Sequence, residues 1–175
     1  MIDAMKTRDV LTEAFGRVKQ WVHGALADMP ADAINYQPDQ GSNSIGWLVW
    51  HLARVQDDHI AHLAGKGQAY SADGWALRLG LAADDGDLGY GHTPQQVAAV
   101  RFEASDDLLA YYDAVHDRTQ QYLDAITPDE LDRVVDTNWD PPVTAGVRLV
   151  SILDDCMNHT GQAHYVKGLW KRLQG

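Results

Sequence analysis

Apolar residues recur with a period of 3.6 residues in four stretches of the chain, which predicts four amphipathic helices. These stretches run over about Thr7–Ala27, Ser44–Ala64, Ser105–Ile126 and Arg148–Leu173. A polar run, residues 41–44, precedes the second stretch and supplies a natural N-cap. No convincing strand is expected, because Gly146 and Arg148 interrupt the β-branched residues between 143 and 150. We therefore expect an all-α four-helix bundle in a single domain spanning residues 1–175.

The connections between the predicted helices are uneven in length. Residues Ser71–His92 are rich in Gly and Asp and predict a long non-helical loop between the second and third helices. A loop of that length inside a domain is usually a functional lid or an insert. A second irregular segment, Asn138–Pro142, leads into the fourth helix. The sequences Thr93–Gln96 and Thr127–Glu130 both read as capping boxes that start short helices.

Composition narrows the classes of partner. The formal charge of −11 repels nucleic acid and anionic lipid, so a small-molecule substrate is expected. No run of about 18 apolar residues predicts a membrane span, and no apolar signal-peptide core is present, so the expected location is cytoplasmic. Cys156 is the single cysteine, which excludes an internal disulfide.

The fourth predicted helix carries two polar residues inside its apolar stripe. Asp155 and His159 are four residues apart, which places them one turn above the other with Cβ atoms about 5–6 Å apart. Burying a carboxylate requires a cation, a metal or a proton. Spacing alone leaves open a structural Asp–His hydrogen bond and a metal site. Arg148, two turns earlier on the same stripe, is a further group that could neutralise Asp155.

The second predicted helix offers histidines on the same side. His51 lies at the edge of its apolar face, and His59 and His62 also point inward. The latter two lie about 12 and 16 Å further along the axis, so the three cannot bind one ion. Periodicity does not choose among them.

Two motifs make the chain similar to a known family. Asn43–Leu52, with the sequence Asn-Ser-Ile-Gly-Trp-Leu-Val-Trp-His-Leu, resembles the second-helix signature of the DinB-like superfamily. His159–Gln162 resembles that family's fourth-helix His-x-Gly-Gln motif. The chain looks closest to the actinobacterial branch related to mycothiol-dependent maleylpyruvate isomerase.

The resemblance implies a metal site between the second and fourth helices. Its ligands would be His51, His159 and the residue four positions before the latter, Asp155, where the mycothiol branch has Glu. It also implies a homodimer. Two imidazoles and one carboxylate leave coordination positions open, as in catalytic sites. Zn²⁺ and Ni²⁺ both suit this ligand set, and Fe(II) is compatible with it.

Other residues are candidates for the surroundings of the site. His92 and Trp139 lie in the irregular segments and would shape a pocket, whereas Gln162 would support His159 or the helix packing. Asp58 is the one candidate general base that we can name, two turns beyond His51.

Three functions are consistent with these residues. The leading hypothesis is a transferase or isomerase in which the metal activates a low-molecular-weight thiol of the mycothiol type toward a small electrophile. The second is a metal-dependent hydrolase that activates water. The third is a non-catalytic stress-response or binding module stabilised by its metal.

Overall fold

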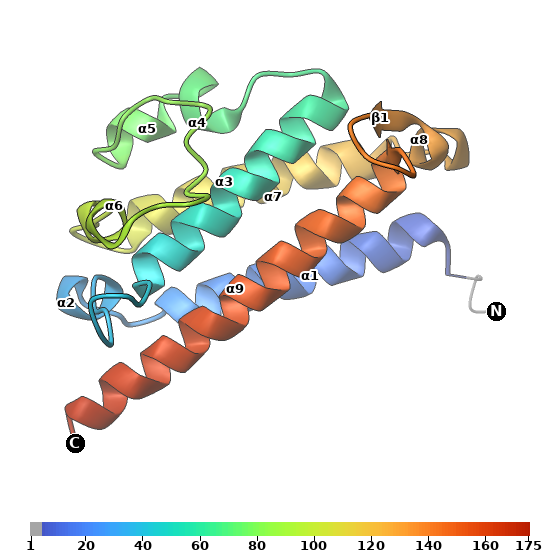
Figure 1. The fold of residues 1–175 in the computed structure, drawn as a ribbon. Coiled ribbons are helices and arrows are strands. Elements are labelled where there is room, and N and C mark those ends of the chain that lie inside the picture. The colour runs from blue at the N-terminus through green and yellow to red at the C-terminus, as the bar shows by residue number, and fades with distance from the viewer. Residues whose placement is uncertain (1–4) are drawn as a thin grey trace.

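Four long helices dominate the computed structural model, which describes residues 5–175 (Figure 1). They are α1 (Thr7–Leu26), α3 (Ile45–Ala64), α7 (Asp106–Asp124) and α9 (Ala145–Leu173). Their ends lie within three residues of the expected ones, and the all-α fold class is confirmed. Helix α3 packs against α7 and α9, and α1 packs against the same two helices from the other side.

Helix α3 is the most deeply buried element. Sixteen of its twenty residues are buried, although a helix at the surface of a bundle normally buries one stripe. The Ser44 hydroxyl caps its N-terminus by accepting from the backbone N–H of Trp47, at 3.1 Å. The residues connecting α3 to α7 cover the side of α3 that faces away from α1 (Figure 1).

Five short helices occupy the connections: α2 (Ala31–Ile34), α4 (Ala69–Ala72), α5 (Trp75–Arg78), α6 (Pro94–Ala99) and α8 (Pro128–Asp132). Helices α4 and α5 correct the expectation that residues 71–92 are non-helical throughout. The predicted capping box at Thr93 forms in full, because Thr93 and Gln96 each accept from the other's backbone N–H. At Thr127 only the first half forms, since the Glu130 carboxylate accepts from Tyr122 and Arg133 instead.

The expectation of no strand is wrong at one place. Strands β1 (Val134–Asp136) and β2 (Val143–Thr144) form an antiparallel pair, with Val134 opposite Thr144 and Asp136 opposite Val143. The pair is short because its second strand runs directly into α9, as the fourth helical pattern requires. Within residues 5–175, no helix combines the length and the apolar character that crossing a bilayer would require.

A pair of glycine substitutions tests the packing around the first turn of α3. A Cβ atom at Gly46 would lie 2.7 Å from Phe102 Cδ2 and 2.9 Å from Ile34 Cγ2. We expect Gly46→Ala to lower the free energy of unfolding by about 1–3 kcal/mol, the typical cost of overpacking. Gly16→Ala in α1 is the matched control, because nothing lies within 4 Å of its added methyl. It should raise the free energy of unfolding by roughly 0.5–1 kcal/mol through helix propensity. Urea denaturation of both variants measures the difference, and equal effects would contradict the packing assignment.

Candidate metal centre

The imidazole of His51 is held on three sides. Trp47, one turn earlier on α3, stacks on one face with ring centroids 4.8 Å apart and planes 14° apart. The Tyr90 ring meets His51 edge to face at 5.0 Å. The Leu88 carbonyl accepts a hydrogen bond from Nδ1. This bond requires the proton on Nδ1, so Nε2 of the neutral ring presents its lone pair away from Leu88.

That lone pair faces two side chains of α9. Asp155 Oδ1 lies 3.8 Å from His51 Nε2 and 3.6 Å from His159 Nε2. The two imidazole rings are nearly perpendicular, at 77°, with centroids 4.7 Å apart. His159 Nδ1 lies 2.8 Å from Gln162 Oε1, so that ring too donates from Nδ1 and presents Nε2. Both histidines thus have the outer hydrogen bond that typically orients metal-bound imidazoles.

The distances fit shared ligation of an ion better than hydrogen bonding. Separations of 3.6 and 3.8 Å are too long for an N–H···O bond. Two ligand atoms each about 2.0–2.2 Å from one tetrahedral ion lie roughly 3.3–3.6 Å apart. The three ligand atoms lie within 4.8 Å of one another. Among the described residues, no other three His, Cys, Asp or Glu side chains form such a group.

An unpaired oxygen makes the case for a cation independently. Asp155 Oδ2 is buried and has no hydrogen-bond partner. A buried carboxylate oxygen without a partner is costly, and ligation of a metal ion is one way to offset that cost. Arg148, which was expected as a possible counter-ion of Asp155, instead pairs with Asp136 of β1 at 3.0 Å. The residues present therefore fit a divalent cation.

The two histidines have opposite pKa shifts. Burial lowers the pKa of His51 below its ordinary value of 6.5, against the opposing effects of Leu88 and Asp155. Burial also acts to lower the pKa of His159, but the nearby negative charge of Asp155 and the hydrogen bond to Gln162 outweigh it, and the pKa is raised. Protons therefore compete with a metal for His159 at higher pH than for His51.

Other predicted residues lie around the site without joining it. Asp58 forms an ion pair with His59 at 3.2 Å and accepts from Gln68 at 2.8 Å. His92 Nδ1 accepts from the Trp47 indole at 3.2 Å, and its Nε2 lies 2.8 Å from Asp87. Through Trp47, His92 supports the stacking partner of His51. Trp139 is 66% exposed in the connection between β1 and β2.

The histidines that periodicity left open are now distinguished. His59 contacts Asp58 and Arg148, and His62 is exposed rather than facing inward, so neither approaches Asp155.

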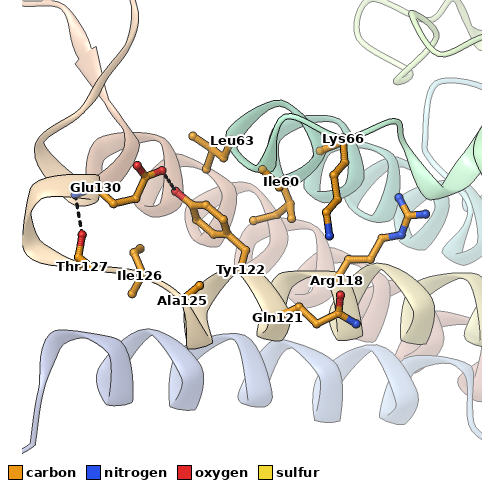
Figure 2. A pocket seen from close by; sticks show the side chains of 12 residues that line it. Ile60, Leu63, Lys66, Arg118, Gln121, Tyr122, Ala125, Ile126, Thr127 and Glu130 are labelled. Atoms are coloured by element: carbon orange, nitrogen blue, oxygen red, sulfur yellow. Dashed lines mark hydrogen bonds between the residues drawn. The ribbon is translucent and has the colours of Figure 1, made fainter.

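A cavity of about 420 Å³ lies between the C-terminal ends of α3 and α7 and the start of α8 (Figure 2). None of the three candidate ligands lines this cavity.

Two contacts of His51 were missed by sequence reasoning: the Leu88 carbonyl and Tyr90. The backbone of Leu88 carries no side-chain signal. A weak signal existed in Gly89-Tyr90-Gly91, because glycines flanking an aromatic residue permit close approach of the chain. Burial and the neighbouring Asp155 raise the pKa of Tyr90 to about 12, so its phenol stays protonated as a hydrogen-bond donor beside the site.

The fold and this site define a helical bundle with a candidate His₂Asp metal centre between α3 and α9. The model of the DinB superfamily matches residues 14–163, and the chain belongs to this superfamily. A crystal structure of a conserved protein from Enterococcus faecalis is similar, with a TM-score of 0.87 and 35% identity. The match covers 94% of this chain and 96% of that one. None of the curated proteins matches the chain.

Gly89 provides a test of the contact between the loop and His51. Its φ of +91° is in the left-handed region, and an added Cβ would lie 3.0 Å from His51 Nδ1, Trp47 and Trp50. Gly89→Ala should displace the Leu88 carbonyl and weaken Zn²⁺ binding about 10–100-fold, as loss of an outer hydrogen bond to a ligand does. Gly91→Ala is the control, because its φ is +71° and nothing lies within 4 Å of the added methyl. Equal Zn²⁺ affinities of the two variants, measured by chelator competition, would refute the role of this contact.

Acidification should release the metal in two stages. Because the pKa of His159 is raised above 6.5, Zn²⁺ affinity should begin to fall while the pH is still above that value. The Zn²⁺ affinity should fall by up to about tenfold for each unit of decreasing pH. It should fall more steeply at the lower pH at which His51, with its lowered pKa, also binds a proton. Dissociation constants measured from about pH 8.5 to 5.5 give the profile. His59→Gln should not change it, and a profile that is flat over this range would contradict the ligand assignment.

Proposed function

We propose that this protein is a divalent-metal-dependent enzyme that activates the thiol of a small cosubstrate for transfer to, or isomerisation of, a small electrophile. His51, Asp155 and His159 would hold the ion. The observation that carries the proposal is the buried, unpaired Oδ2 of Asp155 beside two imidazoles whose Nε2 atoms face the same carboxylate. Three protein ligands leave coordination positions open for a substrate.

The ion would supply Lewis acidity, lowering the pKa of a coordinated thiol so that it is a thiolate at neutral pH. Zn²⁺ or Ni²⁺ suits two imidazoles and a carboxylate, and Fe(II) is compatible with the same donors. The formal net charge of −11 would otherwise disfavour binding of an anionic substrate. A cation at the site would offset this repulsion locally.

The nucleophile must come from outside the chain. Cys156, the single cysteine, is completely buried next to Asp155 on α9. Its Sγ faces Gln56 Oε1 at 3.6 Å, and burial raises the pKa of the thiol well above its ordinary value. Such a thiol is a core residue without reactivity.

The surroundings favour a thiol over water as that nucleophile. Activation of water benefits from a general base near the metal, and the one candidate named from the sequence, Asp58, is engaged by His59 and Gln68. A thiol starts from an ordinary pKa of about 8.5, against about 15.7 for water, so a cation has to lower the pKa of a thiol far less to give the anion at neutral pH. Tyr90, whose ring meets that of His51 edge to face, would lie near a bound electrophile and could donate a hydrogen bond to it.

Access to the site is from the side of α9. The side chains of Asp155 and His159 are 17% and 19% exposed, whereas that of His51 is 3% exposed. His51 would therefore anchor the ion from inside the bundle, and a substrate would approach past the two ligands of α9.

Metal content and thiol transfer test the proposal together. Elemental analysis should find about one Zn or Ni per chain in the wild type and none in the His51→Ala, His159→Ala double variant. The metal-loaded wild type should then conjugate or isomerise electrophilic test substrates with mycothiol, glutathione or L-cysteine, and the double variant should not. His23→Ala and His164→Ala, which change exposed or half-buried histidines of α1 and α9, form the control. Hydrolysis in the absence of thiol, or full metal loading without any thiol chemistry, would overturn the thiol assignment.

A further inference from the structure

A completely buried arginine lies one turn beyond His51 on α3. Arg54 has no exposed surface, and all three of its guanidinium nitrogens are used. Nε donates to the carbonyl of Asp87 at 3.3 Å, and Nη2 donates to the carbonyls of Asp84 and Asp85 at 3.3 and 3.1 Å. Nη1 donates to Gln68 Oε1 at 2.6 Å. Three backbone carbonyls of one four-residue segment thus converge on one side chain.

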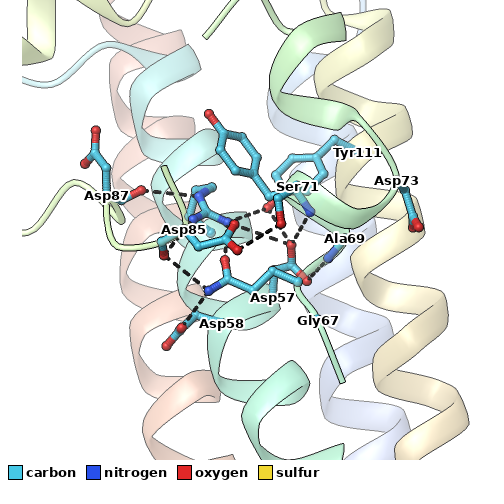
Figure 3. Close-up of polar contacts among 12 residues, drawn as sticks. Asp57, Asp58, Gly67, Ala69, Ser71, Asp73, Asp85, Asp87 and Tyr111 are labelled. Atoms are coloured by element: carbon cyan, nitrogen blue, oxygen red, sulfur yellow. Dashed lines mark hydrogen bonds and ion pairs between the residues drawn. The ribbon is translucent and has the colours of Figure 1, made fainter. Parts of the chain in front are cut away.

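The charge of Arg54 is balanced inside the protein. Asp57 Oδ2 lies 3.8 Å from Nη1, and the Tyr70 ring lies under the guanidinium with its centroid 3.8 Å from Cζ. Asp57 also accepts from the backbone N–H groups of Ala69 and Tyr70 and from the Tyr111 hydroxyl (Figure 3). The ion pair therefore joins α3, α4, α7 and residues 84–87, and its donors and acceptors satisfy one another.

The bound segment is directly continuous with the contacts of His51. The residue after Asp87 is Leu88, whose carbonyl accepts from His51 Nδ1, and Tyr90 follows two residues later. Asp87 itself continues the connection through its carboxylate, which holds His92 against Trp47. Two of the three contacts of His51, the Leu88 carbonyl and Tyr90, thus belong to residues 84–92, and the third, Trp47 on α3, is itself contacted by His92.

We propose that Arg54 is a positioning residue: its hold on the carbonyls of residues 84–87 fixes the Leu88 carbonyl against His51, and thereby sets the tautomer and the metal affinity of this ligand. The effect of Arg54 on metal affinity rests on the proposed metal site. Its effect on the tautomer of His51 does not depend on a metal. A planar guanidinium is needed because a lysine ammonium has three donors at a single point and cannot reach the separate carbonyls and Gln68 together.

Arg54→Lys tests this proposal, with Arg118→Lys as the matched control. Arg118 also holds a connecting segment, donating to the carbonyl of Gly67 at 2.6 Å and to Asp73 at 2.8 Å, but it does not contact residues 84–88. Two-bond ¹H–¹⁵N spectra of the metal-free protein report the tautomer of His51, and a Co²⁺ titration reports affinity and ligand geometry. Gln68→Ala is a second variant, which keeps the arginine but removes the acceptor of its Nη1 together with the hydrogen bonds that Gln68 donates to the Asp85 carbonyl at 3.2 Å and to Asp58 at 2.8 Å.

We expect the wild type and Arg118→Lys to show His51 protonated at Nδ1. Arg54→Lys should show a mixture of tautomers, a shifted Co²⁺ absorption spectrum and about tenfold weaker Co²⁺ binding, the lower end of the range for an outer partner. Gln68→Ala should change the same quantities less. Gly89→Ala combined with Arg54→Lys should weaken binding little more than the stronger single variant, because both act through the Leu88 carbonyl.

The outcomes separate the two proposals. A changed tautomer in Arg54→Lys, with no Co²⁺ binding even in the wild type, would support the positioning role and overturn the proposed metal function. A lower melting temperature of Arg54→Lys or Gln68→Ala, with the wild-type tautomer and wild-type Co²⁺ affinity, would overturn the positioning role. If Arg54→Lys does not fold, Gln68→Ala takes its place. A mixture of His51 tautomers with weaker Co²⁺ binding in this variant would support the positioning role, and the wild-type tautomer with wild-type Co²⁺ affinity would overturn it.

Discussion

Burial of α3 on all sides is the constraint on which the rest of the structure depends. A helix with sixteen of twenty residues buried cannot leave its polar side chains to water, so each of them requires a partner within the protein. Gln56 donates to Thr119 on α7 at 2.7 Å, and Asp57 accepts from α4 and α7. Arg54 takes its partners from the connection between α3 and α7, which explains why this long segment lies against the helix instead of extending into solvent.

His51 is subject to the same constraint, and α9 meets it only in part. One ring nitrogen is satisfied by Leu88, and the other faces a carboxylate that lies beyond hydrogen-bonding distance. The second oxygen of that carboxylate has no partner at all. Arg54 and Asp57 on α3 have their partners within the protein, whereas the Asp155 carboxylate is the one acidic group among the five described side chains that have a buried polar atom without a hydrogen-bond partner. A site with two outer hydrogen bonds in place and its inner atoms unpaired is preorganised for a cation.

Asp155 is one methylene shorter than the glutamate that a relation to the mycothiol branch, expected from the sequence, would place at this position. The shorter side chain keeps its carboxylate close to α9, and the two imidazoles approach it from α3 and from one turn further along α9. The arrangement still brings the three ligand atoms within 4.8 Å of one another. The aspartate side chain is therefore long enough, on this backbone, to place its carboxylate beside both imidazoles.

Much of this architecture was determined by local sequence patterns. The four long helices follow from apolar periodicity, and their boundaries follow from capping residues such as Ser44, because both depend on interactions within a few residues. The pairing of Asp155 with His159 also follows from spacing on one helix. The two-residue strand β2 was not predicted, since so short a strand exists only through its partner β1.

Tertiary structure decided which histidine of α3 meets that pair. Periodicity predicted that His51, His59 and His62 all point inward, and only the crossing of α3 with α9 sets which of them lies beside Asp155. Tertiary structure also pairs Arg148 with Asp136 and places the Leu88 carbonyl against His51. Such contacts join residues far apart in the chain, and a backbone carbonyl has no letter in the sequence. The ligand types were thus determined locally, whereas the assembly of the site was decided by packing between helices.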